Sequence, residues 1–386
     1  MDKLKIGLFI DTYYPMIDGV IMVVDNYAKR LKDRAEVTVF CPKPKSKKYK
    51  DEFEYAVKRC KRVNFFWADY CVGVPKLDRK FRKELDKMQL DIVHIHSPFG
   101  LGKIGVKYAR KHNVPVIATL HSQFKQDFYK ATKMKWLTNI LLKKTMKTFN
   151  DCDLCWAVNE GIGDLFVNDY GLTSPCGVQY NGTEMVTLDK DYTAEINEQY
   201  NIKPDQKVFL FVGRLTLLKN ILFIVDSLSV LKQKGVDFKM LYVGSGGAEA
   251  ELRNRIKKHN LEDDVILCGR VADRVHMAKI YQRADLFLFP SPYDTDGLVK
   301  YEAASQYTPT VSIKGFHCAG NIFDNENGFL SENSPEAYAE KIYEVLNDTE
   351  TLEQVKQTAH DKLYRSWDDV VNYAYDDYKK IIAEKK

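Results

Sequence analysis

Short apolar runs rich in β-branched residues recur along this chain, and segments with helical periodicity separate them. The runs fall into two series, at residues 6–10, 35–40, 91–96, 114–120 and 154–158 and then at 208–212, 239–243, 265–268, 286–289 and 310–312. Strands that alternate with helices form parallel sheets covered by helices on both faces. The pattern therefore predicts an α/β fold with two doubly wound, Rossmann-like parallel-sheet domains.

The length of the chain agrees with two domains, because 386 residues exceed what one ordinary hydrophobic core accommodates. A polar, irregular stretch at residues 185–205 separates the two series of runs, and we interpret it as a linker. The predicted domains are therefore residues 1–184 and 206–365. The last segment, residues 366–386, has the pattern of an amphipathic helix.

Charge and composition exclude several classes of protein. The formal net charge of +5 is too small to indicate a nucleic-acid-binding protein, and no recognised nucleic-acid-binding module is present. No signal peptide follows Met1, and no apolar run reaches the ~18–20 residues that cross a bilayer. We therefore expect a cytoplasmic protein with reduced cysteines. Cys152 and Cys155 have C-x-x-C spacing without a second pair, which favours a buried strand over a redox or zinc site.

Residues 285–305 carry the clearest chemical signal. An apolar run ends at a Pro-Ser-Pro turn, an acidic loop with Asp294 and Asp296 follows, and Gly297 begins a predicted helix that carries Glu302. A buried strand, a tight loop and a helix start form an anion site in α/β proteins, because free backbone N–H groups and the helix dipole face outward there. Asp294 and Glu302 place a carboxylate on each side of this helix start.

A second motif follows the predicted strand at residues 208–212. Gly213 and Arg214 come directly after the strand, and Lys219 lies a few residues further on. Two fixed cations at one position can stabilise negative charge on a ligand without a metal ion. Taken alone, these residues are typical of an exposed helix start. Together with the carboxylates of the later motif, they indicate a binding site.

These two motifs, in this order, resemble those of the glycosyltransferases of family 4, which are retaining enzymes with the GT-B fold. The family signature is Glu, seven residues and Glu, with a Gly-Leu-Val helix start between; here Asp294 stands in place of the first Glu, and Glu302 matches the second. The resemblance implies two domains that face each other across a cleft. It places the acceptor side in residues 1–184 and the nucleotide sugar in 206–365, and it implies that the helix at 366–386 returns to the first domain.

The resemblance also implies a role for each candidate residue of the second domain. Gly213, Arg214 and Lys219 would hold the diphosphate of a sugar nucleotide, Glu302 the ribose hydroxyls, and Asp294 the hydroxyls of the transferred sugar. The remaining candidates are Gly244 near the donor, Arg270 and Val271 at the nucleobase edge, and the N–H groups of Asp296, Gly297 and Leu298 for sugar hydroxyls or the distal phosphate. Asp294-Thr295-Asp296 matches the D-x-D metal motif of the other large glycosyltransferase fold, but Arg214 and Lys219 already supply positive charge. We therefore expect neither a metal ion nor another cofactor.

Two candidates come from the first domain. Gly19 lies between the first predicted strand and the first helix, where the lack of a Cβ lets the backbone approach a diphosphate. His121 follows the strand at 114–120, and ligands bind at the carboxyl ends of parallel strands. In the family, a histidine at this position lies beside the donor sugar. Because the leaving diphosphate can itself accept the proton of the acceptor hydroxyl, we assign no catalytic base; Asp294 and His121 would position the substrates and stabilise charge.

Residues 125–147 form a basic stretch with seven lysines and one aspartate, interleaved with aromatic and aliphatic residues. Such a stretch predicts amphipathic helices that could lie on an anionic membrane surface. A second basic cluster occupies residues 43–50. The alternative for both segments is an ordinary solvated face.

We therefore expect a hexosyltransferase that uses a nucleoside diphosphate sugar, UDP rather than GDP, and acts on a hydroxyl of a membrane lipid or lipid-linked glycan. The protein would then be cytoplasmic and peripheral at the inner face of the cell membrane, without a nucleic-acid partner. A soluble or protein acceptor remains open. A non-catalytic partner subunit also remains open, because Asp294 replaces a glutamate of the motif. A sugar-nucleotide epimerase of the same two-domain shape agrees less well with the carboxylate motif.

Overall fold

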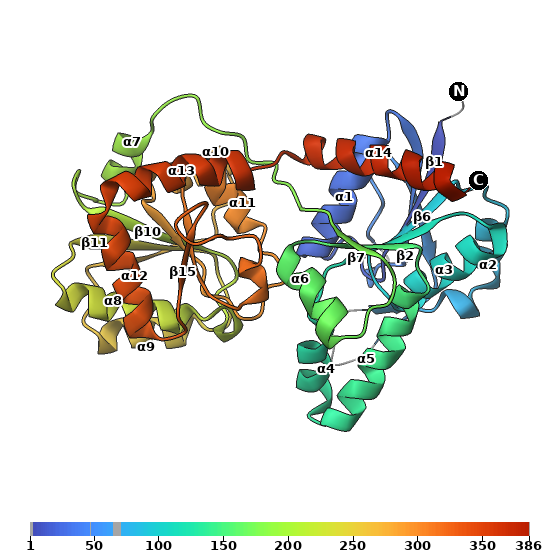
Figure 1. Cartoon of the computed structure of the whole chain (residues 1–386), viewed down its shortest axis with the longest axis horizontal. Coiled ribbons are helices and arrows are strands. Elements are labelled where there is room, and N and C mark those ends of the chain that lie inside the picture. Colours follow the sequence, from blue (N-terminus) through green and yellow to red (C-terminus); the bar gives the residue numbers. More distant parts are fainter. Residues whose placement is uncertain (1–2, 47, 65–70, 386) are drawn as a thin grey trace. The chain divides into compact units, whose positions relative to one another are not determined.

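The computed structural model describes residues 3–46, 48–64 and 71–385 (Figure 1). Of the basic cluster at 43–50, Lys47 lies outside the described residues. The chain divides into two compact units: unit 1 is Met1–Asn181 with Trp367–Lys386, and unit 2 is Gly182–Ser366. Each unit contains a parallel sheet packed against helices, so the prediction of two α/β parallel-sheet domains is confirmed.

The sheet of unit 1 has seven strands among the described residues, in the order β3-β2-β1-β6-β7-β8-β9, and all its pairs are parallel. The strands are β1 (Leu4–Phe9), β2 (Ala35–Pro42), β3 (Ala56–Cys60), β6 (Ile92–Ile95), β7 (Val116–Leu120), β8 (Leu154–Ala157) and β9 (Cys176–Val178), and β4 (Arg62–Asn64) and β5 (Cys71–Gly73) form a separate antiparallel pair. The helices are α1 (Gly19–Leu31), α2 (Arg79–Asp86), α3 (Gly100–His112), α4 (Phe124–Thr132), α5 (Lys135–Asn150), α6 (Glu160–Asp164) and α14 (Trp367–Lys385). Successive side chains of a strand point to opposite faces, so Leu8 joins the core with α1 and α14, and Phe9 joins the core with α3 and α5.

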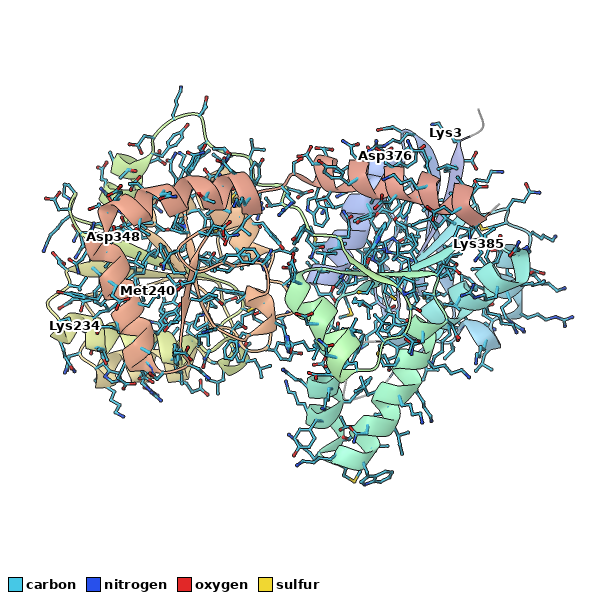
Figure 2. The ribbon with its side chains drawn as sticks, viewed as in Figure 1. Lys3, Lys234, Met240, Asp348, Asp376 and Lys385 are labelled. Atoms are coloured by element: carbon cyan, nitrogen blue, oxygen red, sulfur yellow. The ribbon has the colours of Figure 1, made fainter. Side chains whose placement is uncertain are left out.

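Helix α14 completes unit 1, although it is the last element of the chain, and it packs beside α1 (Figure 1). Trp367 and Tyr378 are buried in the same core as α1. The Tyr378 hydroxyl lies 2.6 Å from Nδ1 of His94 on β6. At the far end of the helix, Lys385 (Figure 2) donates a hydrogen bond of 2.7 Å to the carboxylate of Asp153. The helix is therefore an integral part of the unit 1 core.

The sheet of unit 2 has six strands among the described residues, all parallel, in the order β12-β11-β10-β13-β14-β15. The strands are β10 (Lys207–Val212), β11 (Phe238–Val243), β12 (Val265–Gly269), β13 (Leu286–Leu288), β14 (Thr310–Ile313) and β15 (Phe329–Ser331). The helices are α7 (Thr193–Gln199), α8 (Ile221–Gln233), α9 (Glu249–Lys258), α10 (Arg274–Arg283), α11 (Val299–Ala304), α12 (Pro335–Asn347) and α13 (Thr349–Leu363). Met240 of β11 (Figure 2) is fully buried in the core that α8, α9 and α12 cover.

Both sheets have a point where the strand order reverses. In unit 1 the chain builds outward from β1 through β2 and β3 and then places β6 on the other side of β1. In unit 2 it builds from β10 through β11 and β12 and then places β13 on the other side of β10. Ligands of open α/β sheets bind outside the carboxyl ends of the strands at such points. The loops after β1, β6, β10 and β13 are therefore the first places to look for a site.

The segment at 185–205, interpreted from the sequence as a linker, lies within unit 2. It contains α7, and Ile196 and Ile202 are buried in a core of that unit. The sequence concealed this helix because α7 has seven residues, of which Ile196 is the buried one. The pattern also missed β3, β9 and β15, which all lie at sheet edges. Edge strands are short or partly exposed, so they lack the continuous apolar run that marks a central strand.

Candidate functional site

The switch point of unit 2 brings together the loops that follow β10 and β11. The Leu215 amide donates a hydrogen bond of 3.1 Å to the Ser245 carbonyl, which ties the two loops together. Gly244 has a φ of +138°, and a Cβ there would lie 1.9 Å from the carbonyl oxygen of Gly213. Only glycine fits at this position, because both the left-handed backbone and the close approach exclude a side chain. Gly213 and Gly244, both predicted as site residues, are therefore in direct contact.

Lys219 and Asp294 meet at this point from opposite sides of the strand-order reversal. The Lys219 Nζ lies 2.7 and 2.6 Å from the two carboxylate oxygens of Asp294. Ser291, in the turn after β13, donates a second hydrogen bond of 2.6 Å to that carboxylate. The two charged side chains are about one-fifth exposed. A cation and a carboxylate that the sequence predicts to contact one ligand are thus direct neighbours.

A buried ion pair holds the loop that carries Asp294. Lys300 on α11 is fully buried, and its Nζ lies 2.8 Å from the Asp296 carboxylate. The same Nζ donates hydrogen bonds of 2.7 Å to the Cys318 carbonyl and 2.6 Å to the Asn321 side chain. Tyr301 donates a further bond of 2.7 Å to Asp296. Every donor of the Lys300 ammonium is therefore satisfied, as a buried charge requires.

Glu302 lies on the opposite side of α11 from this pair and has partners of its own. Arg274, at the start of α10, donates a hydrogen bond of 2.9 Å to one carboxylate oxygen, and the Tyr281 hydroxyl donates one of 3.1 Å to the other. Burial raises the pKa of Tyr281 well above its usual value, so this hydroxyl stays protonated and acts as a donor. Glu302 is therefore held in a fixed orientation at the edge of the site.

The other predicted residues of unit 2 differ in exposure and in backbone conformation. The side chains of Arg214 and Arg270 are exposed, and Val271 is half-buried against a core of the unit. Among the described residues, the Arg214 guanidinium makes no hydrogen bond or ion pair. Gly297 has a φ of +78°, and a Cβ there would lie 2.5 Å from the Phe289 ring, so the turn before α11 requires glycine. Leu298 follows at the N-cap position of α11 and makes no side-chain capping hydrogen bond.

In unit 1, His121 directly follows β7 and contacts a second histidine. Its Nε2 lies 3.0 Å from Nδ1 of His96, which follows β6, and the two rings are nearly parallel at 5.3 Å between centroids. His96 is buried and His121 is half-buried. Gly19 begins α1, where the side chain of Asp18 caps the helix by accepting from Ile21, and a Cβ on Gly19 would meet no described atom within 4 Å.

Sequence reasoning missed five side chains that shape the two switch points: Arg274, Tyr281, Ser291, Lys300 and His96. Each contacts a predicted residue. Lys300 carried one usable signal, since a lysine four residues after Asp296 in an apolar helix indicates a buried partner. Ser291 lies three residues before its partner Asp294 in the same turn. Arg274, Tyr281 and His96 had no such signal, because their partners are distant in the sequence.

The acidic residues of the D-x-D pattern each face a lysine, as described above. Among the described residues, no group of three or more His, Cys, Asp or Glu side chains is arranged to hold a metal ion. Cys152 and Cys155 are buried thiols, and Cys155 lies on β8, as expected for a buried strand. A hydrogen bond with Cys152, together with burial, raises the pKa of Cys155, which makes a thiolate there unfavourable.

The basic stretch at 125–147 forms α4 and α5, which pack side by side and project from the sheet of unit 1 (Figure 1). Tyr129, Met134 and Trp136 lie near the turn that joins the two helices and are 46%, 42% and 62% exposed. All the lysines of this stretch are exposed. The helix pair therefore presents an apolar tip within a basic surface. No described helix is both long and apolar enough to span a bilayer.

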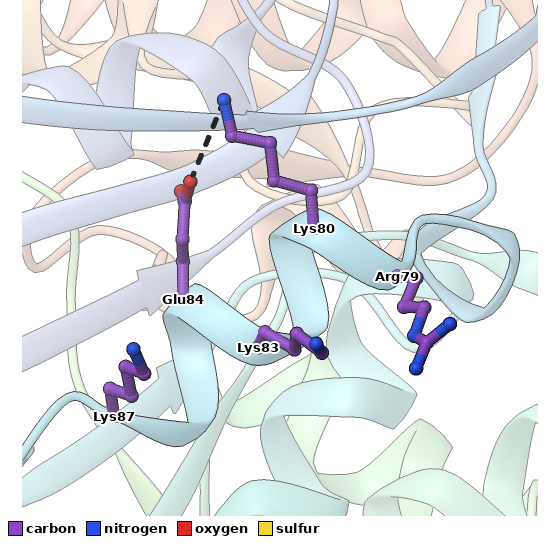
Figure 3. Close-up of a pocket in the computed structure, with 5 residues that line it drawn as sticks. All are labelled: Arg79, Lys80, Lys83, Glu84 and Lys87. Carbon is purple, nitrogen blue, oxygen red and sulfur yellow. Dashed lines mark ion pairs between the residues drawn. The ribbon is translucent and has the colours of Figure 1, made fainter.

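A second basic surface lies on α2 of unit 1 (Figure 3). Arg79, Lys80, Lys83 and Lys87 line a shallow depression together with Glu84. The single ion pair drawn there joins Lys80 and Glu84 at 3.9 Å.

Comparison with known proteins follows the same division of the chain. The family model described as Glycosyltransferase Family 4 matches residues 17–185, and the model described as Glycosyl transferases group 1 matches residues 193–362. The chain is 26% identical over 373 residues to an alpha-monoglucosyldiacylglycerol synthase of Streptococcus pneumoniae, and the match covers 94% of this chain and 82% of that protein. A protein of the same name from Acholeplasma laidlawii is 22% identical over 373 residues, with 92% of each chain covered.

Solved structures are similar over nearly the whole chain. HepE from Anabaena, in complex with UDP, has a TM-score of 0.77 and 17% sequence identity, and the match covers 98% of this chain and all of that one. At this level of identity the likeness concerns the fold.

Proposed function

This chain belongs to the glycosyltransferases of family 4 and has their GT-B fold. We therefore propose that it transfers a hexose from a UDP-hexose to a hydroxyl of a lipid or lipid-linked glycan, with retention of configuration. It is a hexosyltransferase. The donor, the stereochemical course and the acceptor are the proposed part. The observation that carries the proposal is the Lys219–Asp294 pair at the carboxyl ends of β10 and β13.

Lys219 would act on the leaving group. As the bond between the anomeric carbon and the diphosphate oxygen breaks, negative charge develops on the diphosphate. The Lys219 ammonium, held beside Gly213 with no side chain between them, would stabilise that charge. The exposed Arg214 guanidinium follows Gly213 directly and would add a second cation.

Asp294 would change partners when the donor binds. In the structure it neutralises Lys219, and a bound diphosphate would take over that role. The carboxylate could then accept hydrogen bonds from the hydroxyls of the transferred sugar, while Ser291 keeps it in place. The acceptor oxygen would bond to the face of the anomeric carbon that the diphosphate leaves, and its proton would pass to the leaving phosphate oxygen.

Glu302 would bind the ribose. Its carboxylate has four acceptor positions, and Arg274 and Tyr281 use one on each oxygen. One lone pair on each oxygen therefore remains for two neighbouring ribose hydroxyls. UDP as the carrier is supported by the complex of HepE with UDP.

A lipid acceptor is supported by the names of the two synthases above and by the α4–α5 pair. We infer that the exposed tip with Tyr129, Met134 and Trp136 inserts at the surface of an anionic membrane, where aromatic side chains bind at the interface and lysines attract anionic lipid. The protein would then be peripheral to the membrane.

A thermal-shift panel of UDP- and GDP-hexoses tests the donor. A ligand that binds only the native state must raise the melting temperature, and we expect the largest shift with a UDP-hexose. NMR of the glycoside product then gives its anomeric configuration, which should match that of the donor. If no sugar nucleotide shifts the transition, the catalytic proposal is wrong and the partner-subunit interpretation gains.

Sedimentation with liposomes tests the membrane contact. The protein should sediment with vesicles that contain anionic lipid and remain in solution with neutral vesicles. Trp136→Ala should weaken this binding, whereas Tyr373→Ala on α14, which removes a side chain that is 68% exposed in the same unit, should not. Sedimentation that ignores lipid charge, or equal effects of the two variants, would contradict the proposal.

A further inference from the structure

The His96 ring is a buried polar group with an incomplete set of partners. Its Nδ1 lies 3.0 Å from Nε2 of His121, and its Nε2 has no hydrogen-bond partner among the described residues. His96 is 2% exposed, so its ring has almost no contact with bulk solvent. The backbone of His96 is fixed, since its amide donates a hydrogen bond of 2.8 Å to the Phe9 carbonyl on β1.

Three protonation states of His96 are possible, and they differ in whether the unpartnered Nε2 has a proton or a lone pair. If His96 is a cation, a charge is buried and an N–H is unsatisfied. If the neutral ring has its proton on Nε2, a buried N–H donor again lacks a partner. If the proton is on Nδ1, the group without a partner is the lone pair of Nε2. Unsatisfied buried N–H groups are the rarest case in proteins, and a buried unpaired charge costs most.

The surroundings exclude the cation on independent grounds. Burial lowers the pKa of His96 well below its usual value, and the nearby His94 and His121 act in the same direction. His94 lies 4.0 Å away between ring centroids, and its own two nitrogens contact Tyr378 and Thr119. His96 is therefore neutral, with its proton on Nδ1.

From this arrangement we propose that His96 is a positioning residue that fixes His121 in one neutral tautomer, with the proton on Nδ1. The Nδ1–H of His96 donates to Nε2 of His121, so the lone pair on that Nε2 is occupied. The remaining proton of a neutral His121 resides on its Nδ1. Free neutral histidine prefers the opposite tautomer, so the contact has a measurable effect. His121 can then donate a hydrogen bond through Nδ1, and it cannot accept a proton from an acceptor hydroxyl through Nε2.

This inference rests on the proposed function only for its consequence in catalysis. If His121 contacts the donor sugar, it does so as a hydrogen-bond donor to a sugar oxygen, and the acceptor proton goes elsewhere, as the same-face mechanism requires. The tautomer itself is a property of the protein without a substrate.

NMR of the full-length protein with ¹⁵N-labelled histidine tests the tautomer directly. Long-range ¹H–¹⁵N correlations distinguish the two neutral forms, and the His121 signals are assigned by their loss in His121→Asn. We expect the Nδ1–H form in the wild type. The Nε2–H form, or an even mixture, would overturn the proposal.

Two substitutions of His96 sharpen the test. In His96→Asn the side-chain amide can replace the Nδ1 donor, so His121 should keep the Nδ1–H form. In His96→Leu the donor is lost, and His121 should shift toward Nε2–H. If His96→Leu does not fold, the wild-type spectrum and His96→Asn still decide the matter. A His121 signal that is identical in folded His96→Leu and in the wild type would contradict the inference.

Kinetics then separate the tautomer from the proposed function. Loss of one positioned neutral hydrogen bond should lower kcat/KM by roughly 3- to 10-fold in His96→Leu and leave His96→Asn near the wild type. A tautomer shift without a change in rate would support the inference and remove His121 from the proposed site. A failure of every donor to bind would overturn the proposed function and leave the NMR result intact.

Discussion

At the carboxyl edge of the unit 2 sheet the acidic side chains of the site face cations, whereas the same edge of unit 1 has buried histidines. Asp294, Asp296 and Glu302 are paired with Lys219, Lys300 and Arg274. In unit 1, burial lowers the pKa of His94 and His96, so both are neutral. The buried Asp11 accepts hydrogen bonds from the amides of Phe99 and Leu101 and the hydroxyl of Ser97.

This difference shows how one architecture can serve two kinds of recognition. An ammonium such as that of Lys219 can exchange a carboxylate for a phosphate of a ligand at little cost, because it loses one anionic partner and gains another. Neutral donors and acceptors cannot attract an ion in this way, but they fix the direction of a hydrogen bond. In the proposed function, the charged groups of unit 2 would bind the anionic part of the donor, and the neutral histidines of unit 1 would orient hydroxyls.

The buried pair beneath the unit 2 site should give the largest effect. Lys300→Met leaves the Asp296 carboxylate buried without its cation, which should cost about 3–5 kcal/mol of unfolding free energy. Urea unfolding followed by circular dichroism measures the loss. The double variant Lys300→Met/Asp296→Asn should recover part of it, because no uncompensated charge remains. A cost below that of an ordinary neutral hydrogen bond would show that the pair is not what orders this loop.

Removal of the cation in the site itself should mainly affect catalysis. Lys219→Ala should lower kcat by about 10²–10³, because the charge of the leaving diphosphate loses a preorganised partner. Initial rates at saturating donor measure the change. Lys314→Ala provides the control, since the Lys314 side chain is 71% exposed and lies in unit 2. A fall no larger than that of the control would remove Lys219 from the site.

The neutral histidines of unit 1 should make its stability depend on pH. In the unfolded chain these histidines take up protons as the pH falls through about 6.5, whereas the folded pKa values of His94 and His96 are lower. Their contribution is complete above pH 6.5 and is lost as the pH falls, by about 1.4 kcal/mol per pH unit for each histidine.

Tryptophan fluorescence measures this loss selectively, because all four tryptophans lie in the sequence of unit 1. Urea unfolding at pH 7.5 and at pH 5.5 gives the change of unfolding free energy with pH. His96→Asn should make this pH dependence smaller, because one fewer histidine takes up a proton on unfolding. A fluorescence transition that is equally stable at both pH values would mean that the folded histidines bind protons as readily as the unfolded ones.

The smallest effect should come from a neutral contact in unit 1. Tyr378→Phe removes the hydroxyl that lies 2.6 Å from Nδ1 of His94, which should cost about 1–1.5 kcal/mol. The same fluorescence measurement applies. Tyr373→Phe on the same helix should cost nothing measurable, because Tyr373 is exposed. A loss as large as that of Lys300→Met would contradict the distinction between charged and neutral contacts.

The sequence predicted the features that depend on local chain geometry. Both parallel sheets follow from alternating apolar runs, and Gly213, Gly244 and Gly297 lie at tight turns after strands, where a glycine is visible in the sequence. The meeting of Lys219 and Asp294 was also foreseeable, because both follow central parallel strands and so reach the same edge of the sheet.

The remaining parts of the site depend on packing that no local pattern encodes. The sequence predicts Glu302 as a ligand contact, but no local pattern shows that Arg274 and Tyr281 reach the same carboxylate from a preceding helix. His96 was hidden within an apolar strand pattern, and only the fold shows that its ring contacts His121. A charged or polar residue with a distant partner looks the same in the sequence as one without.

The place of α14 has a consequence for biosynthesis. The chain leaves unit 1 at residue 181, builds all of unit 2, and returns to unit 1 at residue 367. A ribosome therefore delivers unit 2 complete while unit 1 still lacks the helix that supplies Trp367 and Tyr378 to its core. The segment made first reaches its final packing last, so truncation of the final twenty residues would impair the beginning of the protein rather than its end.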